Sequence, residues 1–338
     1  MNRFLIVRLG SLGDVIHAIP VAAALKHAYP HARVDWMVDP RYLELLELVT
    51  CVDRAIPVDP RAIKRGAGRA QFKQTLSGLR SEDYDAVLDL QGLLKSAMLA
   101  RSVRGQRTVG FSKTQLREPL ARFFYTHTLD PAGVPHMIYK NLGLLESLQI
   151  SDRRVRFPLA IPRTPVVEQI AQRFGAEGCV LINPGAAWPN KQWPPDRFGA
   201  LAGAIAADLQ LKSLVLWGPG EEDIARRVVE ASGGAAELSP PTTITDLVGI
   251  AHVARLMVSG DTGPLHIAGA VGTPIVSLFG PTRPERNGPW GLYDAAISRV
   301  DRCSCLYQRR CRRPERCIDD IGVAEVMAAV CRRLDACG

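Results

Sequence analysis

The sequence predicts an α/β protein built from two doubly wound units, each with a parallel sheet. Short apolar runs that are typical of buried strands alternate with helical patterns along the whole chain. One stretch rich in proline and arginine, Arg153–Pro165, interrupts this alternation and is interpreted as a linker. A chain of 338 residues, of which 47% are apolar and 22% charged, is too long for one ordinary core. Two domains are therefore expected.

Eight strands are expected, four in each half. They are Phe4–Val7, Val34–Val38, Ala86–Leu90 and Thr108–Gly110, then Cys179–Ile182, Ser213–Trp217, Leu256–Ser259 and Ile275–Phe279. A final helix is expected at about Val323–Leu334, because Val326, Met327 and Val330 form one apolar stripe. No sequence repeat relates the two halves, so any similarity between them would be of fold only.

The first strand runs into the loop Gly10–Asp14, and a helix follows with apolar residues recurring from Val15 to Leu25. Glycines let a ligand approach the backbone closely, and the amides of a first helical turn favour negative charge. Asp14 lies at this point. It is either the N-cap of the helix, a role that stabilises by about 1 kcal/mol, or a carboxylate held at the mouth of a cleft as a general base. This segment alone favours the cap.

Four loops of the second half follow predicted strands, so the topology brings their side chains to one sheet edge. They are residues 183–185 with Lys191, residues 217–221, residues 260–266 and residues 280–282. Thr262 and Gly263 open a helix and offer amides to a phosphate, and Lys191 offers a point charge to a diphosphate. Glu221 is placed to accept from ribose hydroxyls. His266 and Glu221 also have ordinary explanations, as a core histidine and a first-turn acid.

The formal net charge is +8, and the excess of cations is clustered in residues 61–73, 101–122 and 309–316. Clustered cations indicate an anionic partner, which could be a phosphorylated molecule, an anionic membrane or nucleic acid. Each cluster alone is equally compatible with a solvated basic face. No motif that reads nucleic acid is present and aromatic residues make up only 6%, so no nucleic-acid partner is expected.

No apolar run reaches the roughly 18 to 20 residues of a membrane span, and the start of the chain lacks a signal-peptide pattern, so a cytoplasmic protein is expected. Its eight cysteines do not require an oxidising compartment. Four of them lie close together in the sequence: Cys303, Cys305, Cys311 and Cys317. In a reduced compartment this cluster suggests tetrahedral zinc or iron, although the usual C-x2-C pair is missing. A redox-active or purely structural role is equally compatible.

Neither half has a complete G-x-G-x-x-G fingerprint and no G-x-x-x-x-G-K-[ST] motif occurs, which disfavours dehydrogenases and P-loop proteins. The loops instead resemble those of glycosyltransferase family 9, the ADP-heptose lipopolysaccharide heptosyltransferases. The matching segments spread over nearly the whole chain: Arg8–Asp14, Asp89–Leu93 with Lys95 and Ser96, Arg117–Ala121, Asn183–Gly185, Lys191 with Trp193 and Pro194, Trp217 with Gly218, and Asp261–His266. Within the family, the similarity is greatest to enzymes that add the first heptose to Kdo of the inner core.

The resemblance implies a GT-B fold, in which two Rossmann-like domains face each other across a cleft. Residues 1–160 would bind the acceptor, residues 161–320 would bind the nucleotide sugar, and residues 321–338 would form a helix that crosses back to the first domain. By position, Asp14 resembles the catalytic base. The donor set is Lys191, Glu221, Asp261, Thr262, Gly263 and His266, and the acceptor candidates are Ser11, Gly13, Lys64, Gln91 and Arg117. Glu222 is the alternative to Glu221, and Ala186 and Ala187 stand where close members tend to have hydroxyl residues.

The expected activity is inverting transfer of heptose from ADP-heptose to Kdo of the lipopolysaccharide inner core. This reaction needs a carboxylate that takes the acceptor proton, and cations and amides that hold the departing diphosphate. No cofactor is required if Lys191 and a helix N-terminus carry that charge, so a metal at the cysteines would be structural. The expected partners are ADP-heptose, a Kdo-lipid A acceptor and the anionic inner leaflet, to which the enzyme would attach peripherally. Two alternatives stay open: a family-9 enzyme with another sugar or acceptor, and a non-catalytic protein that binds nucleotides or nucleic acid.

Overall fold

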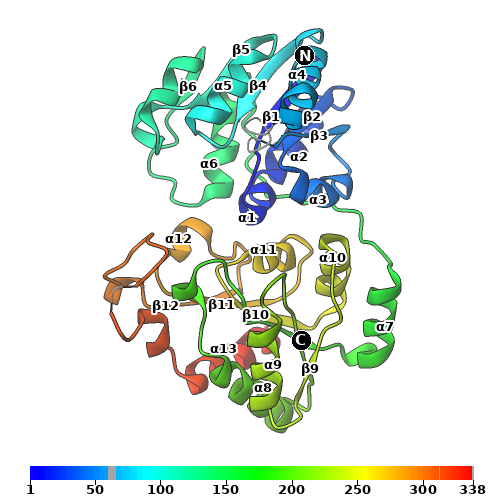
Figure 1. Ribbon diagram of the computed structural model, residues 1–338, viewed down its shortest axis with the longest axis vertical. Coiled ribbons are helices and arrows are strands. Elements are labelled where there is room, and N and C mark those ends of the chain that lie inside the picture. Colours follow the sequence, from blue (N-terminus) through cyan, green and yellow to red (C-terminus); the bar gives the residue numbers. More distant parts are fainter. Residues whose placement is uncertain (60–65, 312, 337–338) are drawn as a thin grey trace. The chain divides into compact units, whose positions relative to one another are not determined.

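The chain divides into two compact units, Met1–Ala160 and Ile161–Gly338, and each contains one six-stranded parallel sheet (Figure 1). The structure is a computed structural model that describes residues 1–59, 66–311 and 313–336. The strand orders are β3-β2-β1-β4-β5-β6 and β12-β11-β10-β7-β8-β9. If β7 to β12 are renumbered from one, both sheets have the order 3-2-1-4-5-6 of Rossmann-type folds. The predicted α/β class with two doubly wound sheets is confirmed.

The strands of the first unit are β1 (Arg3–Val7), β2 (Arg33–Val38), β3 (Arg54–Pro57), β4 (Tyr84–Asp89), β5 (Gly105–Phe111) and β6 (His127–Leu129). Those of the second are β7 (Val180–Asn183), β8 (Ser213–Val215), β9 (Ala236–Leu238), β10 (Leu256–Gly260), β11 (Ile275–Phe279) and β12 (Ala295–Ser298). The central strands β1 and β10 are almost continuously apolar and buried, because helices cover both faces of a parallel sheet.

Helices follow most strands. In the first unit they are α1 (Leu12–Ile16), α2 (Ile19–Ala28), α3 (Leu43–Glu47), α4 (Gly66–Arg80), α5 (Leu94–Ser102) and α6 (Met137–Gly143). In the second they are α7 (Pro165–Phe174), α8 (Pro195–Leu209), α9 (Glu222–Ala231), α10 (Ile244–Val253), α11 (Gly263–Ala270), α12 (Pro284–Asn287) and α13 (Val323–Asp335). Two 3₁₀ segments matter for the sites below, η4 (Pro119–Phe124) and η7 (Pro189–Lys191). Among the described residues, none of the helices is long and apolar enough to cross a bilayer.

All eight expected strands are present, and their ends differ from the prediction by at most three residues. The sequence pattern missed β3, β6, β9 and β12, and these are the outermost strands of the two sheets. An outermost strand pairs on one side only and here is short and half-buried, so it lacks the apolar run that marks a central strand.

The helix expected after the first loop is not continuous. It is divided into α1 and α2, with Pro20 in the first turn of α2, because a proline inside one long helix would remove a hydrogen bond and clash with the preceding turn. The N-cap of α1 is Ser11, and Asp14 is the third residue of the helix. The interpretation of Asp14 as the N-cap is therefore wrong.

The last helix is as expected. In α13 the side chains of Val326, Met327 and Val330 are buried and belong to the same apolar core as Val276 and Leu278 of β11. The stripe needed a surface to cover it, and the sheet of the second unit supplies that surface. The return of this helix to the first domain, implied by the resemblance, stays a prediction.

Candidate functional site

Asp14 lies directly beyond the carboxyl end of β1. Its Oδ2 accepts hydrogen bonds from the backbone N–H of Ser11 (3.0 Å) and from Ser11 Oγ (2.9 Å), and its Oδ1 lies 2.6 Å from Nη2 of Arg8. The Asp14 side chain nevertheless keeps 31% of its exposure. It is an anchored carboxylate that stays partly exposed to solvent, which suits a group that receives a proton from a bound molecule.

Arg8 holds this carboxylate from below the surface. It is buried and follows β1 directly, and its Nη1 donates to the carbonyl of Leu90 at the end of β4. The backbone N–H of Leu9 donates to Oε1 of Gln91 (2.8 Å), which ties the same two strand ends together. The sequence pattern assigned Arg8 no role of its own. The available signal was an arginine placed between a buried strand and a glycine loop.

Asp89 shapes the loop that carries Gln91. This fully buried carboxylate accepts from the N–H groups of Gln91 (2.9 Å) and Gly92 (3.2 Å), from Ser96 Oγ (2.9 Å) and from the Tyr125 hydroxyl (2.8 Å). Burial raises the pKa of Asp89, and the hydrogen bonds from Tyr125 and Ser96 offset only part of that rise. Gly92 has φ +67°, a conformation that favours glycine. The role of Asp89 is therefore to hold the loop.

The five acceptor candidates do not all lie in one place. Ser11 and Gly13 belong to the same turn as Asp14, and Gln91 lies at the end of the neighbouring strand, so these three share one sheet edge with Asp14. Arg117 is exposed on the segment that follows β5. Lys64 lies outside the described residues.

The second basic cluster, residues 101–122, divides between the two edges of the first sheet. Arg101 and Arg104 precede β5 and line a surface hollow beside the starts of β4 and β5. Arg117 and Arg122 follow β5 and so lie toward the carboxyl edge, as Asp14 does. All strands of this sheet run parallel, so the cluster as a whole does not face one ligand, and only its later members share an edge with Asp14.

In the second unit, the buried Asp261 lies beyond the end of β10. Its Oδ2 accepts from Lys191 Nζ (2.5 Å) and Thr282 Oγ1 (2.8 Å), and its Oδ1 lies 3.4 Å from His266 Nε2. Burial by itself raises the pKa of Asp261, but the hydrogen bond to His266 and the charge of Lys191 outweigh burial and hold this pKa well below its usual range. Asp261 stays ionised and keeps the Lys191 ammonium at the sheet edge.

The helix α11 begins at Gly263 after Thr262, as the sequence predicts. Asn183 Nδ2, at the end of β7, donates to Thr262 Oγ1 (3.1 Å) and to Ser259 Oγ (3.1 Å), so two strand ends hold the turn before the helix. The first amides of a helix have no partner within it and attract anions. Asn183 and Thr282 lie in loops that the sequence singled out, but their positioning roles emerge only from these long-range contacts.

Glu221 and Glu222 are clearly different in the structure. Glu221 Oε2 accepts the backbone N–H of Gly218 (3.1 Å), and a Cβ added at Gly185 would lie 2.1 Å from the same oxygen. Burial raises the pKa of Glu221, and the hydrogen bond from Gly218 opposes only part of that rise. Glu222 instead forms an ion pair with Arg226 on α9. Glu221 is therefore the carboxylate that points to the loops of the site, and Gly185 leaves room for it.

The four clustered cysteines lie in residues 303–317, the cysteine loop, between β12 and α13. The Sγ atoms of Cys303 and Cys305 are 3.6 Å apart, and the thiol of Cys317 interacts with that of Cys303. Burial and the neighbouring thiols raise the pKa of Cys317 to about 12. In the part of the chain that the structure describes, no group of three or more His, Cys, Asp or Glu side chains is arranged to hold a metal ion.

The cysteine loop also supports the donor candidates. Asn190 Nδ2 donates to Cys305 Sγ (3.4 Å), and Asn190 directly precedes Lys191. The backbone N–H of Tyr307 donates to the carbonyl of Pro281 (2.8 Å), which directly precedes Thr282. Lys191 follows Asn190, Thr282 follows Pro281, and both bind Asp261. The cysteine loop therefore holds the two segments that meet at that carboxylate.

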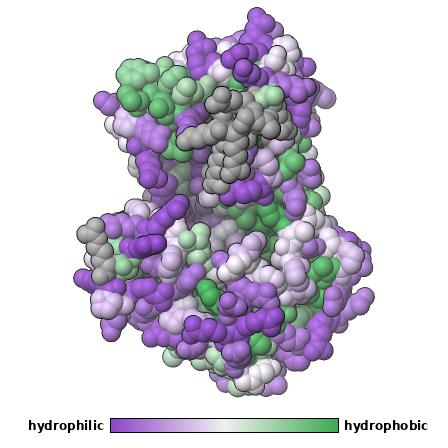
Figure 2. All heavy atoms as spheres, viewed as in Figure 1, coloured by the Kyte–Doolittle hydropathy of each residue, from purple (hydrophilic) through white to green (hydrophobic). Residues whose placement is uncertain are grey.

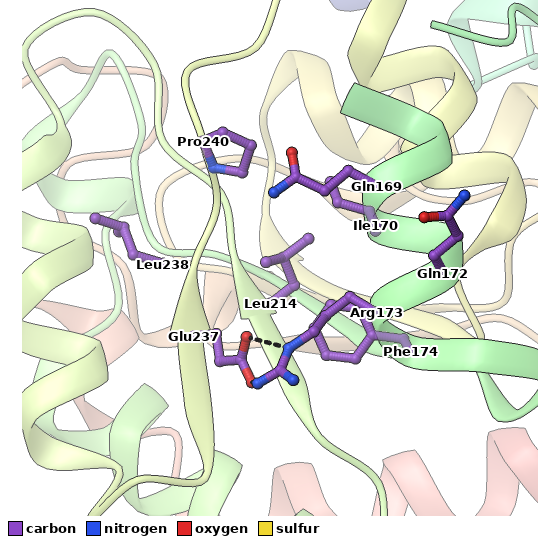
Figure 3. Close-up of a pocket in the computed structure, with 9 residues that line it drawn as sticks. All are labelled: Gln169, Ile170, Gln172, Arg173, Phe174, Leu214, Glu237, Leu238 and Pro240. Carbon is purple, nitrogen blue, oxygen red and sulfur yellow. Dashed lines mark hydrogen bonds and ion pairs between the residues drawn. The ribbon is translucent and has the colours of Figure 1, made fainter. Parts of the chain in front are cut away.

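A surface hollow elsewhere in the second unit lies between α7 and β9 (Figure 3). Gln169, Leu214, Arg173 and Glu237 are among its lining residues, and the last two form an ion pair at 2.7 Å. None of the donor candidates lines this hollow. Since Arg173 neutralises Glu237, the hollow presents no group suited to the transfer chemistry.

A protein-family model covers most of the chain. The model of glycosyltransferase family 9 (heptosyltransferase) matches residues 71–316.

Individual relatives agree with that match. Lipopolysaccharide heptosyltransferase 1 of Escherichia coli is 30% identical over 302 residues, which cover 86% of this chain and 91% of that protein. The protein of the same name from Pseudomonas aeruginosa is 30% identical over 324 residues, covering 91% of this chain and 87% of the relative. The solved structure of E. coli heptosyltransferase WaaC with ADP-2-deoxy-2-fluoro heptose matches with a TM-score of 0.75 and 26% identity, covering 97% of this chain and 98% of that one.

Proposed function

The chain belongs to glycosyltransferase family 9, and we propose that it transfers heptose from ADP-heptose to Kdo of the lipopolysaccharide inner core. The observation that carries the proposal is Asp14, a carboxylate that Arg8 and Ser11 fix at the end of β1 and that stays partly exposed. The similar relatives are named lipopolysaccharide heptosyltransferases, and the similar WaaC structure contains an analogue of ADP-heptose.

In the proposed reaction, Asp14 is the general base. The acceptor hydroxyl oxygen bonds to the anomeric carbon of the heptose while its proton passes to an oxygen of Asp14. The bond from the anomeric carbon to the β-phosphate oxygen breaks at the opposite side of the sugar, so the configuration inverts. Ser11, Gly13 and Gln91 lie at the same sheet edge and are proposed to contact the acceptor. Arg117 and Lys64 are proposed to meet its anionic groups.

The second unit is proposed to hold the ADP. Lys191, kept in place by Asp261, would meet the diphosphate as its charge develops, together with the amides of Thr262 and Gly263 at the start of α11. His266 is proposed to act by holding Asp261. Glu221, rather than Glu222, is proposed to accept from the ribose hydroxyls, because Glu222 is paired with Arg226. In this scheme the transfer needs no cofactor.

A structural zinc or iron at Cys303, Cys305, Cys311 and Cys317 is a separate proposal. Its support is the gathering of the thiols in one loop, with two Sγ atoms 3.6 Å apart. Elemental analysis of protein purified without chelator tests it. About one ion per chain that is lost in the Cys303→Ser variant supports the site, and a metal-free protein with titratable thiols overturns it.

Attachment to the anionic inner leaflet of the membrane is also proposed. Its support is the net charge of +8 together with an acceptor that is linked to lipid A.

One assay tests the proposed function directly. The protein is incubated with ADP-heptose and Kdo-lipid A, and ADP release is compared with the mass gain of the lipid. The proposal requires both, in equal amounts. ADP release without a mass gain would indicate hydrolysis, and transfer that proceeds only with another sugar nucleotide or another acceptor would favour a different family-9 activity.

A further inference from the structure

The first unit exposes three large apolar side chains on adjacent segments. Met98 on α5 keeps 52% of its exposure, and Leu120 and Phe123 on η4 keep 63% and 75%. The segments α5 and η4 pack against each other, and Figure 2 shows apolar surface gathered over the region between β5 and β6, at the upper left. Contiguous apolar surface of this kind marks a docking site far more often than scattered single residues do.

The local geometry explains why these side chains point outward together. In a 3₁₀ helix, residues three apart lie directly above one another, so Leu120 and Phe123 share one face of η4. Ala121, which lies between them, is fully buried and anchors the segment. On α5, Lys95, Met98 and Arg101 also recur at spacing three and are all exposed, so they form one face of that helix.

Cations accompany the apolar side chains. Lys95 and Arg101 stand on either side of Met98, and Arg122 lies between Leu120 and Phe123 in the sequence, with its Cζ 5.8 Å from the centre of the Phe123 ring. Glu118 directly precedes η4. Its carboxylate accepts a hydrogen bond from the backbone N–H of Leu94 (2.7 Å) at the start of α5. The face is therefore apolar and positively charged.

We propose that this face, formed by Lys95, Met98, Leu120, Arg122 and Phe123, docks on an anionic lipid bilayer. The inference rests on the proposed function, in which the acceptor is anchored in such a bilayer. The apolar side chains would enter the boundary between headgroups and acyl chains, while the cations meet lipid phosphates. A second copy of the chain fits less well, because a symmetric contact would bring the same cations together, and the nearby Glu118 carboxylate already accepts the Leu94 N–H.

Co-sedimentation with vesicles tests the surface. Wild-type protein should bind vesicles of phosphatidylethanolamine and phosphatidylglycerol, bind phosphatidylcholine vesicles much less, and release as salt increases. Replacing both Leu120 and Phe123 by serine should weaken binding at least about tenfold. The Arg122→Gln variant should weaken it about fivefold, because one cation near an anionic surface contributes about that factor.

A matched control is available in the second unit. Leu292 is 86% exposed, but residues 288–298 contain no lysine or arginine. The Leu292→Ser variant should bind vesicles as wild type does. Equal loss in this variant, unchanged binding of the Leu120/Phe123 variant, equal binding to both vesicle types, or a shift from dimer to monomer in that variant would each overturn the proposal.

Transfer assays separate this surface from the proposed function. The Leu120/Phe123 variant should keep its ADP affinity and its turnover of a Kdo acceptor without acyl chains, while losing transfer to Kdo-lipid A embedded in vesicles. If instead no acceptor is used by any form of the protein but vesicle binding follows the expected pattern, the proposed function fails and the docking surface stands.

Discussion

The two sheets share one strand order but present their carboxylates in opposite ways. In the first unit, Asp14 at the end of β1 is bound by Arg8 and Ser11 and keeps 31% of its side-chain exposure. In the second, Asp261 at the end of β10 is bound by Lys191 and Thr282 and keeps only 4%. Each carboxylate binds a cation and a hydroxyl, and Asp261 also contacts His266, but Asp14 is far more exposed.

The difference in exposure fits two different roles, a base for Asp14 and a positioning residue for Asp261. A ligand can reach a partly exposed carboxylate, which fits the proposed role of Asp14 as the base. A carboxylate enclosed by three donors has no free side, so Asp261 acts through what it holds, which is the Lys191 ammonium. Under the proposed function, the same sheet topology therefore serves proton transfer in the first unit and charge placement in the second.

The largest expected effect is at Asp14. The Asp14→Asn variant should lose roughly 10²- to 10⁴-fold in turnover, the usual contribution of general base catalysis, because the amide cannot accept the acceptor proton. ADP affinity, measured by calorimetry, should stay at the wild-type value. Near-normal turnover would leave Asp14 as a residue that only stabilises the start of α1.

Removing the Lys191 ammonium should have a smaller effect than Asp14→Asn. In the Lys191→Ala variant, ADP affinity should fall about 10- to 100-fold, since a hydrogen bond to a charged group contributes about 1.5–3 kcal/mol. The control is Lys212→Ala, which removes a largely exposed lysine that pairs with Glu237. Calorimetry that gives equal ADP affinities for the two variants would contradict the assignment of Lys191.

The sequence predicted the central part of both sheets well and their outermost strands poorly. The central strand β1 contains four fully buried residues in a row, Phe4–Val7, which is a strong local signal. The strand β9, Ala236–Leu238, has a glutamate at its centre that pairs with Arg173, and pairing on one side with β8 defines it as a strand. That pairing is a long-range property and leaves little trace in a short stretch of sequence.

The site residues also divide into those that local sequence indicates and those that depend on long-range contacts. Asp14, Lys191 and Asp261 lie on segments that follow predicted strands, and together with the resemblance to family 9 that position was enough to propose them. Arg8 and Thr282 were not selected, because their roles depend on which strand ends lie side by side. The choice of Glu221 over Glu222 likewise depends on the contact with Gly185, which lies 36 positions earlier in the chain.

The holding role of Asp261 also predicts a pH dependence of stability. A carboxyl group whose pKa is lower in the folded than in the unfolded protein contributes stability above its ordinary pKa, and that contribution is lost as the pH falls through the folded value. Asp261→Asn should therefore destabilise by about 1–3 kcal/mol near neutral pH, and its melting temperature should approach that of wild type below about pH 4. Asp208→Asn, at an exposed position on α8, should melt as wild type at every pH. A constant difference for Asp261→Asn from pH 7 to pH 3 would contradict this role.

The smallest expected effect lies one residue before Lys191. Asn190 is buried and donates to Cys305 Sγ and to the carbonyl of Gln308 (2.9 Å), so it ties the segment that carries Lys191 to the cysteine loop. In the Asn190→Ala variant Lys191 should be held less firmly, and ADP affinity should fall about threefold to tenfold, in line with a net 0.5–1.5 kcal/mol for one hydrogen bond. Turnover at saturating donor should change little, since Asp14 lies in the other unit. Cys331→Ala, on α13 and outside the cysteine loop, is the control and should keep wild-type ADP affinity. If Asn190→Ala lowers turnover and leaves ADP affinity intact, the cysteine loop does not act through Lys191.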